Sequence, residues 1–160
     1  MRILVADDEW AVGELLASVC RRGDHEVDMV TSAEAALDHL AISSTDLLIA
    51  DIEMAGDAPS RFMAAVRHAC PGLPVIATVA HDEPLLVAEL FGDGAVDVLK
   101  KPFAMEDLGI RIALVEERRR YVRDLANERM PVRSTVTAFR RPIADRGTVV
   151  EPAERRRGAA

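Results

Sequence analysis

The sequence has few cysteines and no long apolar segment. Its two cysteines, Cys20 and Cys70, match neither a metal-binding spacing nor a disulfide framework, and we expect both to be small buried residues in helices. No apolar run approaches the roughly 20 residues that a membrane-spanning helix requires. The N-terminus enters a strand-like segment at once, without the pattern of a signal peptide. We therefore expect a cytoplasmic protein that does not associate with membranes.

Charge is divided unequally along the chain. Residues 1–117 contain 8 Lys and Arg against 22 Asp and Glu, whereas residues 118–160 contain 12 Arg against 5 acidic residues. A basic segment attached to an acidic body favours either a polyanionic partner such as nucleic acid or an internal clasp. A solvated, weakly ordered segment accounts for the same composition. No helix-turn-helix pattern is present in this part of the sequence.

Strand-like and helix-like segments alternate along the chain, as βα units require. Thr31 and Glu34 form the pattern of a capping box ahead of the second helix. The strands are apolar without polar alternation, which is typical of a parallel sheet buried on both faces. We expect an α/β fold with a doubly wound, five-stranded parallel sheet in a three-layer α/β/α sandwich. The expected strands are Arg2–Ala6, Glu26–Val30, Asp46–Ala50, Pro74–Ala80 and Val96–Leu99; the expected helices are Trp10–Arg22, Ala35–Leu40, one starting at Pro59, Pro84–Phe91 and one starting at Met105.

Charged residues follow three of these expected strands. Asp7 and Asp8 follow the first strand, Asp51 follows the third, and Lys101 follows the fifth. The carboxyl ends of parallel strands meet at one edge of the sheet, where such folds bind their ligands. Convergent carboxylates repel one another unless a divalent cation joins them, and Mg²⁺ prefers oxygen ligands of this kind. A carboxylate beside Mg²⁺ can also act as a nucleophile toward phosphorus.

Five short motifs resemble those of the receiver domains of bacterial two-component response regulators. The resemblance covers roughly residues 1–117 and implies a flavodoxin-like fold. Residues 118–130 would then extend the last helix, and residues 131–160 would form a basic, disordered tail. In chain order, the motifs are Ile3–Glu9, Asp51–Met54, Pro74–Ile76, Gly94–Asp97 and Lys101–Phe103.

The resemblance implies a role for each charged residue of the site. Asp51 would be the phosphoacceptor and would receive its phosphoryl group from a histidine kinase or a phosphotransfer protein. Asp8 would bind Mg²⁺ directly and Asp7 mostly through water, while Asp51 and the backbone carbonyl of Glu53 would supply further oxygens. Lys101 would pair with Asp51 and then with the phosphoryl oxygens. Such a protein is not an enzyme beyond its own phosphorylation and dephosphorylation.

Three positions bear on the conformational switch that receivers usually carry. The fourth strand usually has Thr or Ser immediately before its last Ala, and the fifth strand often has Tyr or Phe, but this chain has Val79 and Val98. Thr78 stands one residue early and should point to the opposite face unless a bulge intervenes. A lost hydrogen bond to a charged acceptor costs about 1.5–3 kcal/mol. We therefore predict that Asp51 is phosphorylated with only a small conformational response.

Two functions are compatible with these residues. The first is a stand-alone phosphoacceptor that signals through protein–protein contacts. The second is a degenerate receiver that acts as a phosphorylation-independent binding module, or as a nucleic-acid-associated adaptor through its Arg-rich tail. The last helix, expected to end before Pro131, could also support a homodimer through a shared apolar face, formed by Leu108, Ile112, Val115, Val122 and Leu125.

Overall fold

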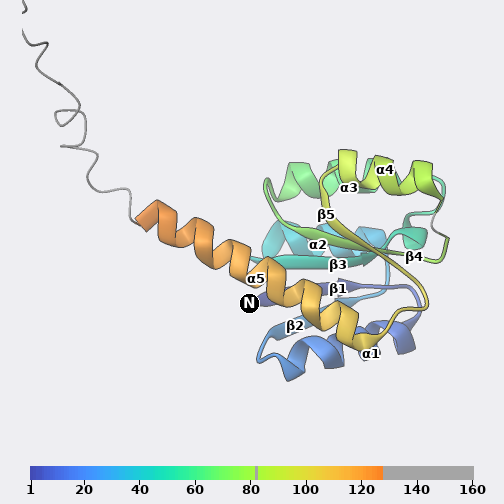
Figure 1. The fold of residues 1–160 in the computed structure, drawn as a ribbon. Helices are drawn as coiled ribbons and strands as arrows, with labels where there is room; N and C mark the ends of the chain where they lie inside the picture. The colour runs from blue at the N-terminus through green and yellow to red at the C-terminus, as the bar shows by residue number, and fades with distance from the viewer. Residues whose placement is uncertain (82, 128–160) are drawn as a thin grey trace, which may run out of the picture. The chain divides into compact units, whose positions relative to one another are not determined.

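Five parallel strands form a single sheet in the computed structural model, which describes residues 1–81 and 83–127 (Figure 1). Their order is β2-β1-β3-β4-β5. From β1 the chain adds β2 on one side of the sheet and then β3, β4 and β5 on the other. The strand order therefore reverses between β1 and β3, where a doubly wound sheet binds its ligands. The predicted doubly wound architecture is confirmed. The strands are β1 Arg2–Ala6, β2 Glu26–Val30, β3 Leu47–Asp51, β4 Val75–Val79 and β5 Ala95–Lys100.

Helices connect the strands, with bounds close to those expected from the sequence. The capping prediction was wrong by one residue: Ser32, not Thr31, precedes the second helix in an extended conformation, and its hydroxyl accepts the Ala35 N–H at 3.1 Å. No helix within residues 1–81 and 83–127 is long and apolar enough to cross a membrane. The helices are α1 Trp10–Arg22, α2 Ala33–Ile42, the short 3₁₀ helix η1 Ile52–Ala55, α3 Pro59–Ala69, α4 Pro84–Gly92 and α5 Met105–Asn127.

Both faces of the sheet are covered, so the core has two halves. Helices α1 and α5 cover one face, and α2, α3 and α4 cover the other (Figure 1). Successive strand residues enter opposite halves: Ile49 packs toward α1 and α5, whereas Leu48 packs toward α2 and α3. Burying a large apolar side chain contributes about 1.5–3 kcal/mol. This double burial explains why the strands lack polar alternation.

The two cysteines differ in their surroundings. Cys20 lies fully buried in α1, and burial raises the pKa of its thiol to about 11. Cys70 lies just after α3 and is half-buried, with its sulfur 3.5 Å from the Leu40 carbonyl oxygen. The prediction of a small buried helical residue is therefore confirmed for Cys20 and wrong for Cys70.

Helix α5 turns one apolar face to the body of the domain. Leu108 and Ile112 are buried against the sheet, and Arg111 pairs with Asp97 of β5. Arg119 donates to the backbone and the carboxylate of Asp46, at 2.8 and 2.6 Å. The helix face predicted to support a homodimer is thus occupied by the domain itself along this stretch, because it completes the core. The expected end before Pro131 and the tail of residues 131–160 lie outside the described residues.

Candidate functional site

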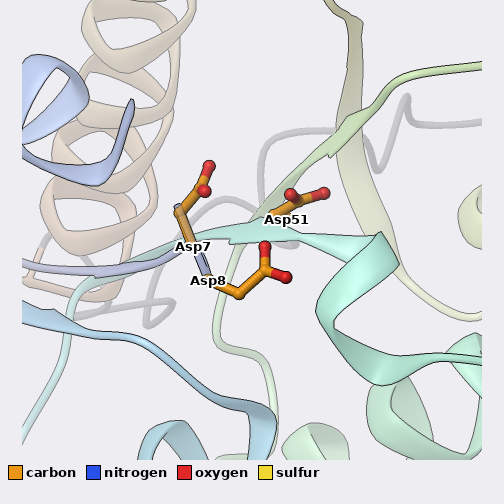
Figure 2. A group of neighbouring side chains, drawn as sticks. All are labelled: Asp7, Asp8 and Asp51. Carbon is orange, nitrogen blue, oxygen red and sulfur yellow. The ribbon is translucent and has the colours of Figure 1, made fainter. Parts of the chain in front are cut away.

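Three carboxylates converge at the carboxyl edge of the sheet. Asp7 and Asp8 directly follow β1, and Asp51 is the last residue of the neighbouring strand β3 (Figure 2). Each of these residues offers one carboxylate oxygen, and the three oxygens lie within 4.8 Å of one another. Parallel pairing of β1 with β3 produces this convergence, because both strands end at the same edge.

A single ammonium group joins two of these carboxylates. The Nζ atom of Lys101 lies 2.8 Å from Asp51 Oδ2 and 3.1 Å from Asp7 Oδ2. Asp7 and Asp51 are buried, with 0% and 3% of their surface exposed. Lys101 follows β5, and β4 lies between β5 and β3, so the lysine side chain crosses the end of β4 to reach its partners. The carboxylates are also held by local backbone donors: Glu9 N–H at 3.0 Å for Asp7 and Glu53 N–H at 3.1 Å for Asp51.

Burial and charge act against each other at this cluster. Burial raises the pKa of Asp7, although the bond from Lys101 and the Glu9 N–H act in the opposite direction. Burial alone would lower the pKa of Lys101, but its bonds to Asp51 and Asp7 outweigh this effect and raise it. The ammonium therefore stays charged at neutral pH. With three carboxylates around one ammonium, the group carries an excess of negative charge.

The donor set of the cluster fits a hard divalent cation. All three side chains offer carboxylate oxygens, and no His or Cys belongs to the group. Mg²⁺ prefers such oxygen ligands, whereas Zn²⁺ sites are usually built from Cys and His. The carbonyl oxygen of Glu53 accepts the Gly56 N–H at 3.0 Å and retains a second lone pair. The carboxylate of Asp8 is exposed to solvent, which leaves room for the water ligands that Mg²⁺ usually keeps.

The side chain of Glu53 makes contacts that the sequence did not reveal. Its Oε1 atom accepts the Ala80 N–H at 3.2 Å and lies 3.5 Å from Nδ1 of His81. Glu53 is the second residue of η1, two positions after Asp51. Its side chain thus links η1 to the residues that follow β4. Sequence reasoning assigned only the Glu53 carbonyl, because nothing in the local pattern specifies where an exposed side chain points.

The two positions where a switch was expected lie on the face opposite Asp51. Val79 is buried in the half of the core covered by α2, α3 and α4, and Val98 packs against the same half. Thr78 pairs with Asp51 and Leu99 in regular register, and the shift in the β4–β5 pairing lies at the other end of β4. No bulge therefore turns Thr78 toward the position of Val79. Its side chain points to the α1–α5 face, as strand alternation predicts.

Known proteins share this arrangement. A family model for the response regulator receiver domain matches residues 3–113. The chain belongs to the response-regulator receiver family. It is 36% identical over 116 residues to the response regulator protein FleR of Pseudomonas aeruginosa, and 30% identical over 120 residues to the DNA-binding transcriptional regulator NtrC of Rhizobium meliloti. These alignments cover 71% and 74% of this chain but 24% and 25% of the relatives, so the chain spans about a quarter of their length.

Solved receiver structures have the same fold. The receiver domain of NtrX from Brucella abortus superposes with a TM-score of 0.66 at 26% identity, covering 72% of this chain and 98% of that one. A CheY-like receiver domain protein from Methanospirillum hungatei gives a TM-score of 0.69 at 20% identity, covering 75% and 97%. Membership of this family places the receiver in two-component signalling.

Replacing Lys101 with Met should destabilise the Mg²⁺-free receiver at pH 7. Asp7 and Asp51 would lose the ammonium that pairs with both, and breaking a buried ion pair costs about 3–5 kcal/mol. We expect the lower end of that range, because Asp7 can take up a proton. The folded state already binds this proton more tightly than the unfolded chain, and the variant would bind it more tightly still, so the stability deficit should shrink as the pH falls from 7 toward 4.

Urea unfolding at pH 7 and at pH 4.5 would measure this effect, with Arg61→Met as the control that removes one positive charge from an exposed side chain. An equal loss of unfolding free energy at both pH values would contradict the coupling to Asp7.

Proposed function

We propose that this receiver accepts a phosphoryl group on Asp51 from a phosphohistidine of a histidine kinase or phosphotransfer protein. The observation that carries the proposal is the ammonium of Lys101, 2.8 Å from a nearly buried Asp51 at the edge where Asp7 and Asp8 converge. Such an ammonium can exchange its bond to Asp51 for bonds to an incoming phosphoryl group. Family membership supports the same reaction.

In this reaction, a carboxylate oxygen of Asp51 attacks phosphorus. The P–N bond to the donor imidazole breaks as the new P–O bond forms, and the product is an acyl phosphate on Asp51. The Glu53 N–H holds Oδ1 at 3.1 Å and so fixes the orientation of the nucleophile. Lys101 offsets negative charge on the transferring group, which is the main requirement of phosphoryl transfer.

Mg²⁺ is the cofactor that we propose for this site. Asp8, Asp51 and the carbonyl of Glu53 would hold it directly, and Asp7 mostly through water. The bound ion supplies positive charge to the phosphoryl oxygens. The excess negative charge of the cluster supports this assignment, because one ammonium cannot balance three carboxylates.

Phosphoryl incorporation from a small phosphodonor tests the assignment of Asp51. We expect Mg²⁺-dependent incorporation in the full chain, its complete loss in Asp51→Asn, and a loss of tenfold or more in Asp8→Asn, since mutations around metal sites typically cost about 10–100-fold. Asp57→Asn is the matched control, because Asp57 is an exposed aspartate six residues away. Incorporation that persists in Asp51→Asn would place the phosphoacceptor elsewhere. No incorporation in a folded wild type would favour the phosphorylation-independent binding module.

A small conformational response to phosphorylation is the second part of the proposal. The two switch positions, Val79 and Val98, are apolar and pack in the same half of the core. Neither side chain can bond to a phosphoryl oxygen, so the free energy that would couple Asp51 to a rearrangement is reduced.

Substituting Val79 with Thr should strengthen this coupling. Val79 is the last residue of β4, so a hydroxyl there would reach past the strand end toward a phosphoryl group on Asp51, although the rest of the side chain packs on the other face of the sheet. The new hydroxyl is buried without an evident partner, and we expect a loss of about 1–3 kcal/mol in stability without a ligand. A Mg²⁺-dependent phosphoryl mimic should recover part of this loss and should raise the melting temperature more than it does for the wild type. Val75→Thr is the control, since Val75 lies on the same strand and the same face at the far end. Equal stabilisation by the mimic in both variants would argue against the coupling.

We propose that a second copy of the chain contacts the outward face of α5. Ile110, Leu114 and Tyr121 are about 60% exposed and lie within about 40° of one another around the helix, on the side opposite Leu108. Their neighbours Glu117 and Arg118 lie on the two edges of this apolar stripe. Two such helices running in the same direction bring the acidic edge of one to the basic edge of the other.

Leu114→Glu should weaken this self-association. A charge in the middle of the apolar stripe should raise the dimer dissociation constant at least tenfold, the equivalent of about 1.4 kcal/mol. Sedimentation of the full chain over a range of concentrations would measure it. Leu85→Glu is the control, because Leu85 is an exposed leucine on another helix, α4. A wild type that stays monomeric at all concentrations would refute the dimer.

A further inference from the structure

Thr78 combines complete burial with an unpaired hydroxyl. It is 0% exposed in β4, and its Oγ1 atom has no hydrogen-bond partner among residues 1–81 and 83–127. Leaving a buried hydroxyl unpaired costs about 1–3 kcal/mol. The other residues of this strand are apolar. A hydrogen-bond partner would stabilise this hydroxyl, and the resting arrangement of the described residues supplies none.

The position of Thr78 indicates which group that partner is. Asp51, Thr78 and Leu99 form one row across strands β3, β4 and β5. Ile49, Ile76 and Leu99 pack toward α1 and α5, and side chains two residues apart on a strand share a face. Asp51 and Thr78 therefore lie on the same face of the sheet, as direct neighbours on adjacent strands.

Lys101 must extend across this same place. It lies two residues after Leu99, and its ammonium bonds to Asp51 on β3, two strands away. Two strand spacings amount to about 10 Å, so the lysine side chain runs over the end of β4, where Thr78 lies. The ammonium has three N–H donors, of which one points to Asp51 and one to Asp7. The third is available to Thr78.

We propose that Thr78 is a positioning residue for Lys101, whose ammonium donates its third N–H to the Thr78 hydroxyl oxygen as it moves from Asp51 to a phosphoryl oxygen. The hydroxyl holds the ammonium over the nucleophile and does not touch the phosphoryl group. Its catalytic consequence rests on the proposed phosphorylation of Asp51, whereas the contact itself requires only a phosphoryl group or its mimic at the site. Val79 cannot replace this function, because it lies on the other face of the sheet.

Lysine ammonium groups can be observed directly in this protein. The chain contains only two lysines, Lys100 and Lys101. Protein labelled with ¹⁵N-lysine therefore gives two ammonium signals, and Lys101→Met assigns them. The probe is the Mg²⁺-bound full chain with and without a phosphoryl mimic. With the mimic bound, we expect Thr78→Val to speed hydrogen exchange of the Lys101 ammonium about tenfold, as the loss of one hydrogen bond to a charged group implies.

A second readout follows the reaction itself. Thr78→Val should lower the maximal rate of phosphoryl incorporation from a small phosphodonor about tenfold without changing the concentration of donor that gives half the maximal rate. Thr78→Ser, which keeps the hydroxyl, should restore both the rate and the slow exchange. Thr45 precedes β3, at the amino ends of the strands and thus at the end of the sheet away from Asp51. Thr45→Val should therefore change neither the rate nor the exchange. Valine matches threonine in shape, and backbone amide spectra would verify the fold of each variant.

The outcomes separate this inference from the proposed function. Slow ammonium exchange that persists in Thr78→Val would overturn the positioning role, whatever the rate of phosphorylation. A Thr78→Ser variant that restores neither the rate nor the slow exchange would also overturn it, because the shape of the side chain rather than its hydroxyl would then account for the effect of Thr78→Val. If the wild type takes up no phosphoryl group, but the Lys101 ammonium of the chain bound to Mg²⁺ and the mimic exchanges faster in Thr78→Val than in the wild type, the contact would be supported and phosphorylation of Asp51 refuted.

Discussion

The ammonium of Lys101, held between Asp7 and Asp51, is the interaction on which the site depends. It brings a cation from β5 over β4 to carboxylates on β3 and after β1, and so spans four neighbouring strands. Two nearly buried carboxylates beside each other are costly without such a partner. The parallel sheet makes the arrangement feasible, because every strand delivers its last residues to the same edge. One ammonium does not balance three carboxylates, and the remaining negative charge makes the cluster suitable for holding a divalent cation.

The positions of the strands and helices and the doubly wound architecture could be predicted from the sequence because local pattern and burial agree. Apolar strands without alternation required cover on both faces, and the structure supplies it with two helices on one side and three on the other. The errors lie where several residues compete for one role. Thr31 and Ser32 both suit a helix start, and backbone conformation decides between them. The apolar residues of α5 were read as one interface, but the inner ones, such as Leu108 and Ile112, complete the core and the outer ones stay exposed.

The candidate site was predictable to the extent that strand ends determine it. Asp7, Asp8, Asp51 and Lys101 each stand at the end of a strand, and parallel topology then brings them together. Side-chain directions away from the strands were not predictable, which is why the bond from Ala80 N–H to the Glu53 carboxylate was missed. Thr78 could be singled out from the sequence, but the burial of its hydroxyl without a hydrogen-bond partner could not be predicted, because that burial depends on α1 and α5 packing over its face of the sheet.

Strand alternation separates two sets of residues in this receiver. Asp51 and Thr78 lie on the α1–α5 face, whereas Val79 and Val98 lie on the face covered by α2, α3 and α4. Asp51 and Thr78 therefore do not share packing with Val79 and Val98. The first set can be polar while the second is valine, since the two are buried in different halves of the core. Under the proposed function, phosphoryl acceptance and conformational response would thus be separable properties of the same sheet, and the polar groups of this chain would serve the first.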